Sequence, residues 1–128
     1  MPDNRKELMQ YRLQTAKERL SSSALLLREH SYKDSINRSY YAMFTAVRAL
    51  LAIEGQDFSK HAGVISYFQK EFIKTGKFDK KYSKYISQAF QIRNNVDYAD
   101  FFLVSEQDAK EQLDHAIEFV NAIADYLQ

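Results

Sequence analysis

Residues 31–55 read SYKDSINRSYYAMFTAVRALLAIEG, and this stretch decides the fold. Its apolar residues recur every three or four positions, which places them on one face of an α-helix. The stripe consists of Ile36, Tyr40, Met43, Phe44, Val47, Leu50 and Leu51. Ser31 suits an N-cap with Asp34 three residues later, and Gly55 suits the left-handed residue that ends a helix. We therefore predict one long helix here, the central and most buried one.

Four more amphipathic segments flank this helix, one before it and three after it. They run approximately over residues 4–29, over 60–75, from 79 onward, and over 105–127. The last opens with Ser105 and Asp108 at capping-box spacing, and Gly76 follows the end of the third. Short connections between amphipathic helices favour antiparallel neighbours. The pattern predicts an all-α, up-and-down bundle of about five helices in a single domain, residues 1–128.

Composition excludes several classes of protein. The 128 residues include only 3 glycines and 1 proline, too few for the many turns of a β-rich fold. The chain has no cysteine, which excludes disulfides, thiolate nucleophiles and cysteine-based zinc sites. No apolar run approaches the roughly 20 residues of a membrane span, and the N-terminus lacks the apolar core of a signal peptide. We expect a cytoplasmic protein without a membrane contact.

The net charge of +1 favours neither nucleic acid nor membrane, but the charges are unevenly distributed. Residues 70–84 contain six lysines against two acids, whereas residues 97–125 contain eight acids against one lysine. These segments could make a head-to-tail or dimeric contact, or they could be two solvated helix faces. RNA binding would require the lysines of 70–84, or Arg38, Arg48 and Arg93, to gather around one cleft.

Arg93, Asn94 and Asp97 form the first candidate site, in the stretch QIRNNVDYAD of residues 91–100. Arg93 falls on the apolar stripe of its helix, where a charged residue is unusual. At a spacing of four, Arg93 and Asp97 share a helix face. The arginine fork suits a phosphate, and asparagine can position a reacting group or a base edge. Asp97 could orient Arg93 or accept a proton; an ion pair at a helix end is the purely structural alternative.

Tyr41 and Arg48 form a second candidate site on the central helix. Tyr41 points about 100° away from Tyr40, and Arg48 lies seven residues after it, on the same side. Tyrosines beside an arginine could stack a base. They could equally fill the core and an interface, with their hydroxyls bonded to neighbours.

Lys60 and His61 form the third candidate site, at the start of the third segment. A helix N-terminus carries free N–H groups and partial positive charge, so it suits an anion, and Lys60 would reinforce it. His61 could also be a satisfied structural residue. The sequence shows no ligand set for a metal ion, no glycine-rich phosphate loop and no nucleophile–base pair. We therefore predict no metal and no cofactor.

Three stretches in the order RSYYAMF (38–44), KHAGVI (60–65) and RNNVDYADF (93–101) carry a family resemblance. The chain resembles the small stand-alone HEPN-domain proteins of bacteria and archaea, over residues 5–127. The resemblance implies an up-and-down helical bundle that forms homodimers. Many such proteins are encoded beside a minimal nucleotidyltransferase and act with it as a two-component toxin–antitoxin pair.

The resemblance also implies a chemistry. Active HEPN proteins are metal-independent endoribonucleases whose motif is an arginine, a polar residue, a few further positions and a histidine. The arginine holds the phosphate and the histidine acts on the ribose hydroxyl or the leaving group, with two copies meeting across the dimer. Arg93 and Asn94 match this motif, but Tyr98 stands where the histidine is expected. A phenol ordinarily titrates near pH 10 and is a poor base, so Tyr98 or His61 would have to substitute.

Three hypotheses follow. The first is a homodimeric partner of a minimal nucleotidyltransferase that binds nucleotide or RNA, with cleavage in doubt because Tyr98 replaces the motif histidine. Since some partner enzymes modify a tyrosine next to the motif, Tyr98 is also a candidate for modification. The alternative is a metal-independent endoribonuclease toxin that uses Arg93 and Asn94 across the dimer interface. A purely structural helical adaptor would explain the stripes but not the place of Arg93.

Overall fold

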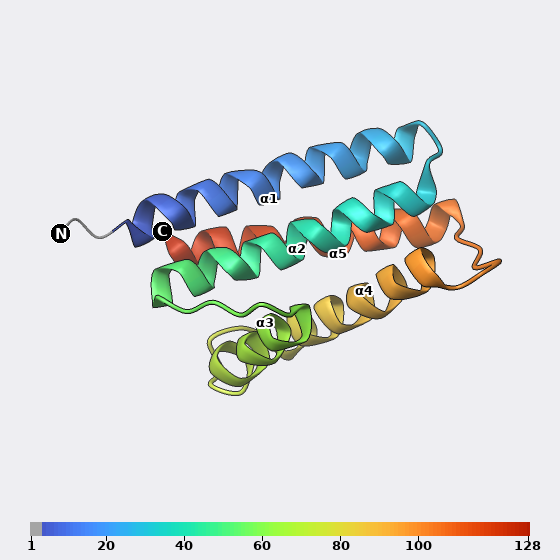
Figure 1. Ribbon diagram of the computed structural model, residues 1–128. Coiled ribbons are helices and arrows are strands. Elements are labelled where there is room, and N and C mark those ends of the chain that lie inside the picture. The colour runs from blue at the N-terminus through green and yellow to red at the C-terminus, as the bar shows by residue number, and fades with distance from the viewer. Residues whose placement is uncertain (1–3) are drawn as a thin grey trace.

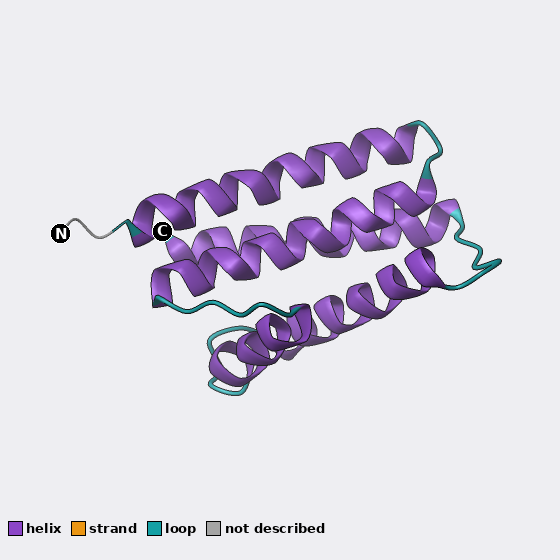
Figure 2. Ribbon diagram, in the orientation of Figure 1, coloured by secondary structure: helices purple, strands orange, loops and turns teal. Residues whose placement is uncertain are grey.

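The computed structural model describes residues 4–128 as a bundle of five α-helices and one π-helical turn, with no strand in that range (Figures 1 and 2). The α-helices are α1 (Arg5–Arg28), α2 (Tyr32–Glu54), α3 (His61–Phe68), α4 (Lys80–Tyr98) and α5 (Glu106–Leu127). The four long helices run in alternating directions (Figure 1). The predicted all-α, up-and-down bundle is therefore confirmed, while residues 1–3 of the predicted domain lie outside the described residues.

The core is built around α2, which contacts each of the other four α-helices. Along α2, Tyr40, Met43, Val47, Leu50 and Leu51 are fully buried, as the apolar stripe predicted. They belong to one apolar cluster with large side chains from the later helices, including Phe68, Phe72, Ile86, Phe119 and Ile123. The most strongly patterned stretch of the sequence thus forms the centre of the molecule.

Two of the predicted helix caps are confirmed, and the third is right in its position but wrong in its hydrogen bond. Ser105 and Asp108 make a reciprocal capping box at the start of α5, and Gly55 ends α2 with φ of 70°. Ser31, the residue before α2, makes no side-chain cap, and its ψ is 74°. The two residues that do cap through their side chains, Asp79 and Ser105, have extended ψ values of 147° and 165°. An extended backbone directs the capping oxygen toward the free N–H groups. Ser31 does not have this backbone conformation.

The third predicted segment is not one continuous α-helix. It begins at His61, as expected, but after Phe68 it widens into a π-helical turn over Gln69–Ile73. Such turns accommodate an extra residue and reorient the side chains that follow. Phe72 lies in this turn and is fully buried, with its ring centroid 6.1 Å from Phe68 and 5.9 Å from Phe78. Sequence periodicity alone did not distinguish this turn from an α-helix.

The lysine-rich and acid-rich segments meet within the chain. Lys81 of α4 forms an ion pair with Glu118 of α5, and the same carboxylate accepts a hydrogen bond from the Tyr85 hydroxyl at 3.0 Å. Part of the charge asymmetry is therefore compensated between α4 and α5. Across residues 4–128, none of the helices combines the length and apolar character needed to cross a membrane.

Candidate functional site

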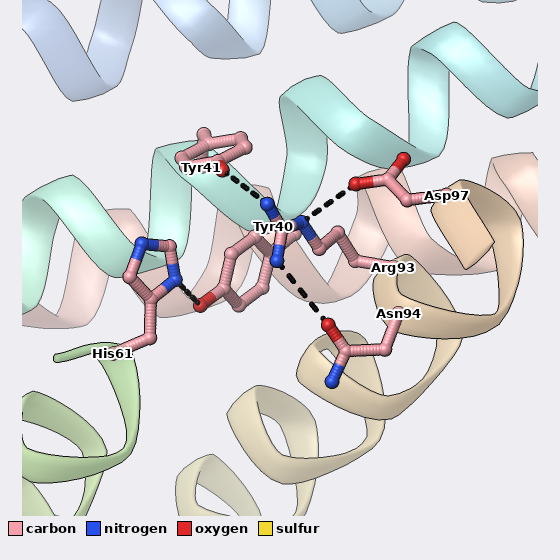
Figure 3. A network of polar contacts seen from close by, with 6 residues as sticks. All are labelled: Tyr40, Tyr41, His61, Arg93, Asn94 and Asp97. Carbon is pink, nitrogen blue, oxygen red and sulfur yellow. Dashed lines mark hydrogen bonds and ion pairs between the residues drawn. The ribbon is translucent and has the colours of Figure 1, made fainter.

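The Arg93 guanidinium lies between α4 and α2, where three side chains contact its nitrogens (Figure 3). Nη2 donates to the Tyr41 hydroxyl at 2.7 Å, and Nη1 donates to Asn94 Oδ1 at 3.2 Å. Nε faces Asp97 Oδ2 at 3.0 Å in an ion pair without the direction of a hydrogen bond. The Arg93–Asp97 pair that helical spacing predicted is present, and the side chain of Arg93 is 17% exposed.

Two aromatic rings explain why a charged residue interrupts the apolar stripe of α4. The guanidinium carbon of Arg93 lies 5.7 Å from the ring centroid of Tyr40 and 5.4 Å from that of Tyr41. Aromatic faces attract cations at these distances, more strongly when water is excluded. The paired tyrosines of α2 therefore form a platform that holds Arg93 in a largely buried position.

His61, the first residue of α3, joins this network through Tyr40 (Figure 3). Its Nδ1 is hydrogen-bonded to the Tyr40 hydroxyl at 2.7 Å, and its ring stacks on Phe44 with centroids 4.1 Å apart. Partial burial, followed by the positive charges of Arg93 and Arg48, lowers the pKa of His61 below its ordinary 6.5. The imidazole is therefore neutral at pH 7. Burial raises the pKa of Tyr40 far above its usual range, so its phenol stays protonated.

The geometry supports anion binding and proton transfer. A guanidinium has five N–H donors, and the hydrogen bonds to Asn94 and Tyr41 use one donor on each terminal nitrogen. One N–H on each terminal nitrogen is left to meet a phosphate oxygen. In the tautomer whose Nδ1–H donates to the Tyr40 oxygen, Nε2 of the neutral His61 imidazole can accept a proton at the same site. The network thus combines a preorganised cation with a neutral base.

The candidate residues separate into two groups. The first group forms the network and consists of Tyr41, His61, Arg93, Asn94 and Asp97, with His61 joined to Arg93 through Tyr40. The other three lie outside it.

Tyr98 ends α4 and is 77% exposed. Lys60 is an exposed N-cap residue of α3, and its side chain makes no capping hydrogen bond. Arg48 faces Asp57 at 3.7 Å, although its charge acts on His61. His61, rather than Tyr98, therefore shares the site with Arg93.

Tyr40 is the member of the network that sequence reasoning missed. Its place on the apolar stripe predicted a core residue, and its side chain is indeed fully buried. A buried tyrosine needs a partner for its hydroxyl, which was the available signal. That requirement could have directed attention from Tyr40 to a polar side chain on a neighbouring helix. Separately, residues 4–128 contain no cluster of three or more histidine, aspartate or glutamate side chains arranged to hold a metal ion.

Comparison with known proteins places the chain in a family. The model of the HEPN domain matches residues 9–126. A "UPF0332 protein" of Thermotoga maritima is 36% identical, over 94% of this chain and 92% of that protein. Two proteins of Methanocaldococcus jannaschii, "Putative toxin MJ0142" and "Putative toxin MJ0605", are 33% and 31% identical, over 90% and 92% of this chain and 78% and 87% of their own lengths. The chain belongs to the HEPN domain family.

Proposed function

We propose that this protein is the HEPN partner of a minimal nucleotidyltransferase in a two-component, toxin–antitoxin-type module, where it binds RNA or a nucleotide as a homodimer. Membership of the HEPN family supports this proposal, as do two relatives whose names include the word "toxin". The observation that carries it is the Arg93 guanidinium, held against two tyrosine rings with N–H groups left for a phosphate. A purely structural adaptor would have no need of a cation at this position.

The end of α4 and the loop that follows it support the homodimer. Tyr98, Phe101 and Leu103 are 77%, 96% and 87% exposed, and Phe101 has a positive φ of 59°. Large apolar side chains gathered in one exposed loop are typical of a protein contact. Because this loop directly follows the helix that carries Arg93, a dimer formed through it would bring two Arg93 networks near one interface.

The proposal is tested by expressing the protein in a bacterial host with and without a candidate minimal nucleotidyltransferase. We expect growth inhibition that the second protein relieves, and co-purification of the two proteins. Light scattering should show a dimer for the wild type and a monomer for the Phe101→Ser, Leu103→Ser double variant. A monomeric wild type that neither inhibits growth nor binds the nucleotidyltransferase would contradict the proposal.

A metal-independent endoribonuclease is the second candidate, and the position of His61 favours it. In this mechanism His61 takes the proton of a ribose 2′-hydroxyl, and the 2′-oxygen forms a bond to phosphorus. The bond from phosphorus to the 5′-oxygen breaks, and the leaving oxygen takes up a proton from solvent water. Arg93, oriented by Asn94 and Asp97, stabilises the charge on the phosphate. The products would carry a 2′,3′-cyclic phosphate and a 5′-hydroxyl.

This mechanism is tested by incubating the purified protein with transfer RNA and mixed cellular RNA in the presence of EDTA. We expect the Arg93→Ala and His61→Gln variants to lose cleavage and Tyr98→Phe to retain it. Loss of cleavage in Tyr98→Phe instead would assign the base to Tyr98. If the well-folded wild-type dimer cleaves neither RNA, the endoribonuclease hypothesis fails. The role as partner of a nucleotidyltransferase is then the only proposal left.

A further inference from the structure

A second basic site lies between α1 and α2, next to the Arg93 network. A hollow of about 340 Å³ there is lined by polar and basic side chains, chiefly Tyr11, Arg12, Thr15 and Arg19 of α1, and Thr45 and Arg48 of α2. Three of its lining residues are arginines and none is acidic. We call this hollow the arginine groove. Such an excess of positive charge in a concave surface concentrates field lines and attracts anions.

The three guanidinium groups are poorly supplied with acceptors. Arg12 Nη1 donates to the backbone carbonyl of Arg48 at 2.9 Å, which anchors the side chain without neutralising it. Arg48 meets Asp57 only at 3.7 Å, and Nε of Arg19 is buried without a hydrogen-bond partner among the described residues. Burial and the neighbouring charge of Arg48 lower the pKa of Arg12, although it remains fully charged at pH 7. The positive charge of the groove is therefore only partly compensated.

Two residues connect the arginine groove to the Arg93 network. The guanidinium carbon of Arg19 lies 5.8 Å from the ring centroid of Tyr41, and the hydroxyl of Tyr41 accepts the hydrogen bond from Arg93. Arg48 lines the groove, and its charge also acts on His61. An extended anion in the groove could consequently continue onto Arg93.

We propose that the arginine groove binds the sugar–phosphate backbone of single-stranded RNA and leads it to Arg93. This inference deepens the proposed function and rests on it, because it takes RNA as the ligand of the Arg93 site. Arginine forks match phosphate oxygens, and the threonine hydroxyls add hydrogen-bond donors. Tyr11, which is 71% exposed beside Arg12, offers a ring on which a base can stack. A stacking ring favours a single strand over an acidic polypeptide.

The proposal is tested by fluorescence anisotropy with a fluorescein-labelled strand of twelve uridines over a range of salt concentrations. Each phosphate contact on a single strand contributes a slope of about 0.7 to the plot of log affinity against log salt. We expect the Arg19→Gln, Arg48→Gln double variant to lower the slope by about 1.4 and to weaken binding roughly 25-fold at 0.1 M salt. Arg28→Gln is the matched control, because Arg28 is an exposed arginine of α1 outside the groove.

Tyr11 provides a second, charge-independent measurement. Tyr11→Phe should bind the strand as the wild type does, whereas Tyr11→Ala should bind it several-fold more weakly with an unchanged salt slope. Circular dichroism before each titration ensures that only folded variants are compared. Equal loss in Tyr11→Phe and Tyr11→Ala would contradict base stacking.

Three results would overturn the groove proposal: equal slopes for the double variant and Arg28→Gln, no binding of the strand at 0.05 M salt, or displacement by polyglutamate but not by unlabelled RNA. The last result would assign the groove to an acidic protein. The proposed function fails separately, through absent growth inhibition and absent co-purification. A salt slope that depends on Arg19 and Arg48 would then still support RNA binding in the arginine groove.

Discussion

Two polar clusters lie on α2, one shared with α1 and the other with α4, and they are built on different principles. With α1, the hydroxyls of Ser23, Ser35 and Ser39 meet, with Ser23 Oγ 2.9 Å from Ser35 Oγ and close enough at 2.7 Å to accept a hydrogen bond from Ser39 Oγ. Ser23 and Ser35 also donate to each other's backbone carbonyls at 2.8 and 2.9 Å. With α4, a charged and partly exposed Arg93 contacts the hydroxyl of Tyr41.

The difference separates a structural cluster from a functional one. The three serines are fully buried, and the hydroxyls of Ser23 and Ser35 are bonded within the cluster, so it has little left to offer a ligand. Small side chains also allow two helices to approach closely. Arg93 has N–H groups that its neighbours do not use, and it lies beside a neutral histidine. We therefore expect substitutions in the serine cluster to change stability and those in the Arg93 network to change ligand binding.

The largest effect on stability is expected from Ser23→Leu. The leucine side chain has two more non-hydrogen atoms than serine and cannot fit between α1 and α2 without displacing a helix, and the hydroxyl of Ser39 loses its partner. Overpacking and the lost hydrogen bonds should together reduce the free energy of unfolding by about 3 kcal/mol, measured by urea denaturation. The adjacent, exposed Ser22→Leu is the control and should change it by less than about 0.5 kcal/mol. Similar values for the two variants would refute the role of the serine cluster.

A smaller effect is expected from Tyr40→Phe, which changes the Arg93 network without opening a cavity. The substitution removes the 2.7 Å hydrogen bond to His61 and retains the buried ring. It should reduce the free energy of unfolding by about 1 kcal/mol in the same urea experiment. Tyr126→Phe is the control, because Tyr126 is 43% exposed and water can serve as the hydrogen-bond partner of its hydroxyl. A reduction of about 3 kcal/mol would instead show that the Arg93 network contributes as much to stability as the serine cluster does.

Arg93→Lys should change stability even less, but it should change function strongly. Lysine keeps the positive charge near Asp97 but cannot reach Tyr41, Asn94 and Asp97 with one planar fork. Because the pair is partly exposed, unfolding should change by only about 0.5 kcal/mol. Cleavage or RNA binding should fall at least tenfold, measured on the same preparation. Unchanged function would show that a point charge suffices at this position.

The smallest effect is the pH dependence contributed by His61. Its folded pKa is lower than its unfolded value of about 6.5, so the unfolded state binds more protons in the interval between the two values. Its contribution to stability is thus complete above about pH 6.5 and is lost as the pH falls through the folded value. Thermal unfolding between pH 5 and 7.5 should show a shallower decline for His61→Gln than for the wild type. An identical decline would show that His61 does not contribute to the pH dependence of stability.

Much of the Arg93 site could be predicted from neighbouring residues along one helix. Arg93, Asn94 and Asp97 lie within five positions of α4, so their shared face follows from helical geometry. The histidine partner could not be inferred in the same way. His61 meets Tyr40 across 21 residues, and Tyr41 meets Arg93 across 52. The catalytic role of Tyr98 remains a prediction, although its exposure separates it from the network.

The sequence by itself determined the helices, because the spacing of apolar residues and the capping residues act locally, within one or two turns. It thereby determined that α2 is central and that Arg93 and Asp97 are paired. Only the tertiary structure decided that Tyr40 and Tyr41 hold Arg93, and that Arg12, Arg19 and Arg48 share one groove. These contacts depend on how far each helix is rotated and shifted against its neighbour. That depends on the packing of the whole core, which no local pattern encodes.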